Sequence, residues 1–319
     1  MPTPLVICDP HFHLIDVTQN PYPWLEPTAR RPDIFAGQDE YLRHVFRAED
    51  YAKYMHDNQV IAAVHVQANW DPSDPVGETR WLTAVHAEHA IPTGLVGYAN
   101  LASDDLDDVL DGHLTSELTR GIRQILNWHT DPKLRFTDRG DYLADPVWRQ
   151  GCRALVKRGL SLDTQIFPQQ FDGLLHVARL NPDLQIIVNH AGMPIDRSTE
   201  GLDYWTGGMR RLASAPNVAM KISGLGLGQY EWDYEAARTL ALRVIEIFGL
   251  ERSMFASNHP VEGIWVSFGQ MYEDFKRMIS DLTHEEQQQL LADNALRIYR
   301  LSITDAGVAF DDVDPRGAS

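Results

Sequence analysis

Cysteine is scarce in this chain of 319 residues. Only Cys8 and Cys152 occur, far apart and outside any CxxC pattern. This distribution argues against a structural disulfide and fits a reducing compartment. Because Cys8 lies inside an apolar run, we expect it to be a buried packing residue.

Long apolar stretches are also missing. No run of 18 apolar residues occurs, so the sequence predicts no transmembrane helix. The first four residues, Met-Pro-Thr-Pro, do not lead from a basic region into a long apolar one, so no signal peptide is expected. These absences together predict a soluble, cytoplasmic protein.

Positive charge is in short supply. The chain has 28 Lys and Arg against 45 Asp and Glu, a formal net charge of −17. The largest basic clusters are the pairs Arg30-Arg31 and Arg210-Arg211. Such a surface repels nucleic acid and anionic membranes. The expected partner is a small-molecule substrate, and the sequence leaves open whether the chain forms a homo-oligomer.

Nucleotide-binding fingerprints are absent, since no GxGxxG or GxxxxGK[ST] motif follows an apolar run. What the sequence does contain is eight short apolar runs that alternate with segments of helical periodicity. This alternation predicts one (β/α)8 barrel over residues 1–301, followed by a loose tail over 302–319. A doubly wound open sheet is the structural alternative. The predicted strands are Leu5–Cys8, Val60–Val66, Gly94–Leu101, Gly121–Leu126, Leu160–Ile166, Leu184–Val188, Val218–Ile222 and Ser253–Ala256.

One connection is too long for an ordinary loop between a strand and a helix. The segment Leu14–Arg47 is rich in proline and aromatic residues, and we expect this extended first loop to fold over the barrel mouth. Trp24 lies within it. Its indole either stacks on a flat or sugar-like substrate or anchors the loop by packing.

The first strand ends in a pair of histidines, His11 and His13. Alternate residues of a strand point to the same side, so both imidazoles project together. This arrangement suits a metal ion or a polarised carbonyl better than a core. In a (β/α)8 barrel the active site lies at the carboxyl ends of the strands. Polar residues gather at these ends in every strand: His11, His13, His65, Gln67, Asn100, Arg123, Asn127, His129, Asp163, Gln165, Asn189, His190, Lys221, Ser223, Asn258 and His259.

A set of motifs in this order resembles the amidohydrolase superfamily, in the branch that includes sugar-acid lactonases and 2-pyrone-4,6-dicarboxylate hydrolase. The resemblance covers about residues 5–301 and supports the same barrel fold. Each motif is short, and their order and spacing carry the likeness. The motifs are Asp9-Pro10-His11-Phe12-His13, Tyr22-Pro23-Trp24-Leu25, Gly121-Ile122-Arg123, Asn189-His190-Ala191-Gly192-Met193-Pro194, Lys221-Ile222-Ser223-Gly224-Leu225, Met254 to Val261 and Asn294 to Tyr299.

The resemblance implies roles for several of these residues. His11, His13 and His190 would either hold one Zn²⁺ or polarise the substrate carbonyl without a metal. Arg123 would bind a substrate carboxylate through its planar fork, although a buried salt bridge to Asp163 is an equal alternative. The remaining candidates for contacts to substrate hydroxyls or carboxylates are Gln67, Asn127 and Gln165.

Two departures from the family pattern bear on mechanism. Many members carry Asp where this chain has Asn258, and an amide has no useful basicity. The base would then be His259, a metal hydroxide or an unidentified carboxylate, while Asn258 could still hydrogen-bond the substrate. Strand four has no lysine to carbamylate, so at most one metal ion is expected. Lys221 is expected to be structural or substrate-facing.

The resemblance therefore predicts a hydrolase of a small cyclic ester, either a sugar-acid lactone or a pyrone-type dicarboxylate lactone. In this prediction Asn258 and His259 orient the attacking water or accept its proton. The first alternative is a metal-dependent, non-oxidative decarboxylase of an aromatic or muconate-like acid. The second is a barrel that binds a ligand without catalysis, an interpretation that only the amide of Asn258 favours.

Overall fold

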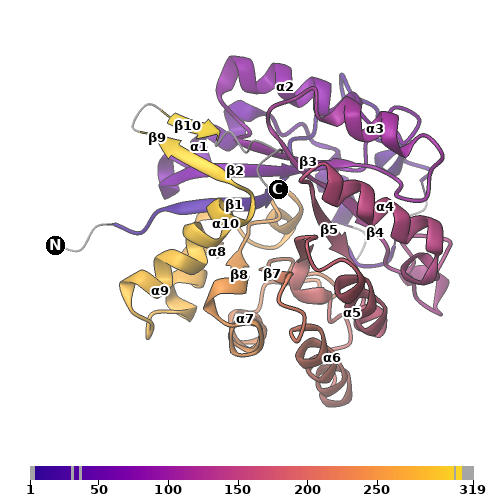
Figure 1. Ribbon diagram of the computed structural model, residues 1–319. Helices are drawn as coiled ribbons and strands as arrows, with labels where there is room; N and C mark the ends of the chain where they lie inside the picture. Colours follow the sequence, from indigo (N-terminus) through magenta and orange to yellow (C-terminus); the bar gives the residue numbers. More distant parts are fainter. Residues whose placement is uncertain (1–3, 30–31, 36–37, 305–306, 311–319) are drawn as a thin grey trace, which may run out of the picture.

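Eight parallel strands in sequential order form one barrel-shaped sheet in the computed structural model, which describes residues 4–29, 32–35, 38–304 and 307–310 (Figure 1). The barrel closes where Phe12 bridges His259, and the His13 N–H donates to the His259 carbonyl at 2.7 Å. The predicted (β/α)8 barrel is confirmed. Its strands are β1 Ile7–Phe12, β2 Val60–Val66, β3 Gly94–Tyr98, β4 Thr119–Ile125, β5 Ser161–Gln165, β6 Ile186–Val188, β7 Val218–Ile222 and β8 Ser253–Phe255.

Helices surround the sheet and follow the strands in alternation (Figure 1). Their starts carry recognisable signals. At α4, for example, Asp145 caps the helix by accepting from the Val147 N–H at 2.8 Å, and Pro146 occupies the first turn. The main helices are α1 Ala48–Asn58, α2 Gly77–His89, α3 Leu106–His113, α4 Pro146–Lys157, α5 Phe171–Leu180, α6 Thr199–Leu212, α7 Tyr234–Phe248, α8 Phe268–Met278, α9 His284–Gln288 and α10 Asn294–Ile298.

The barrel interior is filled by side chains, and residues from the end of the chain cover the amino ends of the strands. Small side chains of β2, such as Ala62, Val64 and Val66, share one buried cluster with Tyr299 and Leu301 from the end of the chain. Leu301 lies beside Gly94, the first residue of β3. The amino ends of the strands are therefore covered, which leaves the carboxyl ends for a site.

The extended first loop covers those carboxyl ends, as the sequence predicts. Its two ends are held together by a short antiparallel bridge in which Ile15 and Phe46 exchange hydrogen bonds of 2.9 and 2.7 Å. Between them, apolar loop residues pack on Phe167 and Met193, which follow β5 and β6. The loop thus forms a wall over the mouth of the barrel.

Apart from shifts of up to three residues at other strand ends, the structure differs from the sequence prediction at β1 and in the tail. β1 runs further than predicted, because it passes Pro10 by an irregular register, and there the His11 N–H bonds to Asp9 Oδ1 at 3.3 Å. The tail begins with a two-stranded antiparallel hairpin of β9 Leu301–Thr304 and β10 Gly307–Phe310, while 311–319 lies outside the described residues. Of the helices in the described ranges, none combines the length and apolar character needed to cross a bilayer.

Candidate active site

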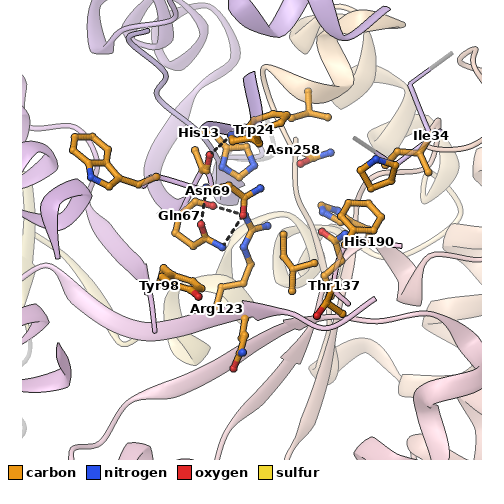
Figure 2. A pocket seen from close by; sticks show the side chains of 18 of the residues that line it. His13, Trp24, Ile34, Gln67, Asn69, Tyr98, Arg123, Thr137, His190 and Asn258 are labelled. Carbon is orange, nitrogen blue, oxygen red and sulfur yellow. Dashed lines mark hydrogen bonds between the residues drawn. The ribbon is translucent and has the colours of Figure 1, made fainter. Parts of the chain in front are cut away.

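A cavity of about 400 Å³ opens at the carboxyl ends of the strands (Figure 2). Its floor is polar and its walls, supplied by loops, are largely aromatic and aliphatic. The polar lining residues include His13, Gln67, Asn69, Arg123, Gln165, His190 and Asn258. The apolar walls include Ile15, Trp24, Ile34, Phe35, Trp70, Phe136, Leu227 and Val261.

Two of the residues that line this cavity are histidines, His13 and His190, and the fully buried ring of His11 lies next to both. The ring centroid of His11 is 5.0 Å from that of His13 and 4.7 Å from that of His190. Burial lowers the pKa of all three well below the ordinary value. The nearby Arg123 lowers all three further, and Lys221 also lowers the pKa of His11 and His190. The imidazoles are therefore neutral at pH 7, and each offers one donor and one acceptor nitrogen.

Hydrogen bonds fix the tautomers of two of these rings. His13 Nδ1 lies 2.6 Å from the Val66 carbonyl, to which it donates, so its Nε2 carries a lone pair. His11 Nδ1 lies 3.4 Å from the Lys221 ammonium and accepts from it, so its Nε2 carries a proton. That buried Nε2 has no partner among the described residues, which is typical of a site that a ligand completes.

Lys221 belongs to a buried network below the histidines. Its ammonium lies 2.7 Å from Asp163 Oδ1, and both side chains are fully buried. The Tyr299 hydroxyl donates to the same carboxylate at 2.9 Å, and the Asn189 amide donates at 3.0 Å. This network positions His11, so Lys221 acts as a structural residue of the floor.

Arg123 carries a buried charge at the centre of the cavity (Figure 2). Burial lowers the pKa of its guanidinium to about 10, so it remains charged at pH 7. It donates to the Gln67 carbonyl, and its Nε has no partner among the described residues. The carboxylate of Asp163 is bonded instead to Lys221, which disfavours the alternative salt bridge. A buried guanidinium with free donors is suited to an anionic ligand group.

The Gln67–Ala68 peptide group lies between Arg123 and the carboxyl group of Glu78. Glu78, on α2, accepts from the Ala68 N–H at 2.9 Å, while Arg123 donates to the carbonyl of the same peptide. Burial raises the pKa of Glu78 to about 8, and Arg123 acts against that rise. The peptide thus connects the cavity floor to α2.

Asn258 and His259, the two residues after strand eight that the sequence predicts to orient the water, point in different directions. Asn258 lines the cavity. The ring of His259 turns the other way, 5.1 Å from Tyr54 and 5.6 Å from Phe268 between ring centroids, outside the residues that line the cavity. Burial lowers its pKa to about 4. His259 therefore packs in the core behind the cavity.

The other sequence candidates divide between the lining and its support. Gln67 and Gln165 line the cavity, whereas Asn127 is buried behind it and, with its amide oriented to suit its neighbours, donates to the Gln165 carbonyl at 3.0 Å. Trp24 anchors the loop, whereas its stacking on a substrate stays a prediction. Its indole N–H donates to the Ala68 carbonyl at 2.8 Å, which anchors the loop, and its ring lines the cavity.

The donor set at the floor does not fit a divalent metal ion. Among the residues that the structure describes, no three His, Cys, Asp or Glu side chains converge as ligands. Asn258 stands where a carboxylate would neutralise the ion, and Lys221 and Arg123 add positive charge beside the imidazoles. His11 presents an N–H rather than a lone pair at Nε2. We therefore derive no chemical step that uses a metal.

We expect chelator treatment to leave catalysis unchanged. Protein dialysed against EDTA should keep its initial rate within about twofold, because no step in the site requires a Lewis acid. The measurement compares rates before and after dialysis with zinc content by plasma mass spectrometry. A rate that falls with zinc content and returns on adding zinc would show that the histidines hold an ion after all.

Several site residues were not found by sequence reasoning. Arg135 and Phe136 line the cavity from the loop after β4, and Glu262 lies buried behind Asn258. Strand ends could be located from apolar runs, but the course of a loop over the barrel mouth leaves no periodic signal. Buried carboxylates such as Glu262 look like surface residues in a sequence.

Comparisons with known proteins agree with this geometry. The profile of the family described as Amidohydrolase (Amidohydro_2) matches residues 8–301. An uncharacterized Sinorhizobium fredii protein, y4mH, is 39% identical over 93% of this chain and 99% of its own. An L-fucono-1,5-lactonase of Burkholderia multivorans is 26% identical over 92% of this chain and 95% of its own.

A solved structure shows the same fold. A zinc-bound amidohydrolase of Burkholderia multivorans superposes with a TM-score of 0.75 at 21% identity, covering 92% of this chain and 99% of that one. With the family profile spanning almost the whole barrel, the conclusion is direct: this chain belongs to the amidohydrolase family and is an amidohydrolase-type hydrolase.

Proposed function

We propose that the protein hydrolyses a small cyclic ester, a sugar-acid lactone or a pyrone-type lactone that carries a carboxylate. The observation that supports this proposal is the combination, at one cavity, of two tautomer-fixed imidazoles, His11 and His13, with the buried guanidinium of Arg123, whose Nε has no partner among the described residues. Relatives named as lactonases, at 29% and 26% identity, also support it.

In the proposed reaction the substrate carboxylate binds Arg123, and the lactone carbonyl accepts from His11 Nε2–H. Water attacks the carbonyl carbon while His13 Nε2 accepts its proton. The bond from the carbonyl carbon to the ring oxygen then breaks, and the proton passes from His13 to the departing oxygen. The product is the open hydroxy acid. Preorganised donors at the developing oxyanion and a positioned base each lower the barrier.

A panel of lactones tests this function. We expect proton release, followed with a pH indicator at pH 7, to exceed the buffer rate for at least one lactone, with carboxylated lactones having the lowest KM. Aromatic carboxylic acids, assayed in parallel for carbon dioxide, should not react. Carbon dioxide release without lactone hydrolysis would favour the decarboxylase, and inertness toward both panels would favour a ligand-binding barrel.

A further inference from the structure

A buried carboxyl group stands directly behind Asn258. Glu262 lies in the short 3-10 turn Val261–Ile264 that follows strand eight, and it is fully buried. Its Oε1 accepts from the Gly226 N–H at 2.6 Å, and its Oε2 lies 3.4 Å from the side-chain nitrogen of Asn258. Nothing in the proposed reaction uses this group, and burying a carboxyl costs free energy that its contacts must offset.

The chemistry of these contacts determines which way the Asn258 amide faces. An ionised carboxylate only accepts hydrogen bonds, so Asn258 must turn its NH₂ group toward Glu262. Its Oδ1 is then the atom available to the cavity that Asn258 lines. The backbone of Asn258 is held independently: its N–H donates to the His11 carbonyl at 2.7 Å, and its φ is 52°.

We propose that Glu262 is a positioning residue that holds the Asn258 amide with its oxygen toward the cavity, where it accepts a hydrogen bond from the attacking water. This inference rests on the proposed hydrolysis. A water that donates one proton to Asn258 Oδ1 and the other to His13 Nε2 has both protons engaged, and a lone pair is then free for the carbonyl carbon. The carboxylate thus acts through the amide and does not touch the substrate.

The variant Glu262→Gln tests this arrangement sharply. The Gly226 N–H would keep the new carbonyl oxygen in place, so the new NH₂ group would face Asn258 and force its amide to turn over. A donor would then face the water in place of an acceptor. We expect kcat to fall about 10- to 100-fold with KM changed less than about threefold, since misorientation of a reacting group costs up to about 10²-fold. Kinetics are measured at pH 8, above the pKa of about 7 to which burial raises Glu262.

Rescue by a second substitution separates positioning from a merely structural role. Asn258→Asp alone would place two carboxylates together and should lower both kcat and the melting temperature. With Glu262→Gln added, the new amide would donate to the new carboxylate, and an acceptor would again face the cavity. We expect the double variant to recover to within about tenfold of the parent kcat. Glu231→Gln, at an exposed position before α7, is the matched control and should retain the parent kcat.

The parent protein, the two single variants at 262 and 258 and the double variant are also compared by thermal unfolding, which requires no substrate. The two substitutions are coupled if the effect of the double variant differs from the sum of the two single effects. Coupling in both kcat and melting temperature would support the proposal. Coupling in melting temperature with additive effects on kcat would overturn the positioning role, as would a Glu262→Gln variant with parent kcat. If no lactone is hydrolysed by the parent protein, the proposed function fails. The unfolding cycle then decides whether Glu262 holds Asn258, and additive melting temperatures would refute that contact.

Discussion

The double variant His11→Ala, His13→Ala is expected to hydrolyse lactones at least about 10³-fold more slowly than the parent protein. Removing a donor to the oxyanion costs about 10²–10³-fold in rate, and removing a positioned proton acceptor costs about 10²–10⁴-fold. In the proposed reaction His11 supplies the donor at Nε2 and His13 the acceptor, so the double change removes both. The measurement is kcat by continuous proton release.

His56→Ala provides the control for this experiment, because His56 lies exposed on α1 and is not among the residues that line the cavity. It should turn over at the parent rate. Circular dichroism must show that the double variant still folds, since both imidazoles are buried and their removal leaves a cavity. A folded double variant with a kcat within threefold of the parent would eliminate the proposed roles of both histidines.

The largest effect on stability is expected from Asp163→Ala. Asp163 is bonded to Lys221, Tyr299 and Asn189, all of them buried. Removing the carboxylate leaves the Lys221 ammonium as an uncompensated buried charge, which costs about 3–5 kcal/mol. For a chain of this size the melting temperature should fall by about 10 °C, measured by differential scanning calorimetry.

The charge pair can also be removed as a whole. The double variant Asp163→Leu, Lys221→Met buries no unpaired charge, so it should lose less stability than Asp163→Ala alone. In this double variant the His11 ring loses the ammonium that fixes its tautomer. We therefore expect kcat to be lower than in the parent protein even if the melting temperature is restored. Equal melting temperatures for Asp163→Ala and the parent protein would contradict the structural role of the network.

Much of the barrel was predictable because its strands are short apolar runs. β2 and β7 begin and end where the sequence analysis places them, Val60–Val66 and Val218–Ile222. β1 was predicted too short because Pro10 interrupts its apolar pattern, and only the tertiary structure shows how the register shifts around it. The hairpin of β9 and β10 was missed because the acidic end of the chain has the composition of a loose tail.

The site was predictable where strand position alone decides it. Parallel strands bring their carboxyl ends together, so His11, His13, His190 and Arg123 had to meet. The direction of the His259 side chain was not predictable, because Asn258 and His259 follow β8 and the positive φ of Asn258 interrupts the regular alternation of a strand. The roles of Lys221 and Glu262 depend on distances between segments far apart in sequence, and no local pattern reports those distances.

The bridge between Ile15 and Phe46 has a consequence for how such a protein can change over time. The bridge joins the two ends of the first loop next to β1. The length of the loop between these ends can therefore vary with little effect on the barrel. Closing a flexible loop of twice the length costs only about 0.6 kcal/mol more. Ile34 and Phe35, which line the cavity, belong to this loop, whereas His11 lies in β1 and His13 and His190 lie just after β1 and β6. Insertions and deletions in this loop would therefore change which substrates fit the cavity without moving the reacting groups. Substrate preference can then evolve independently of the chemical step.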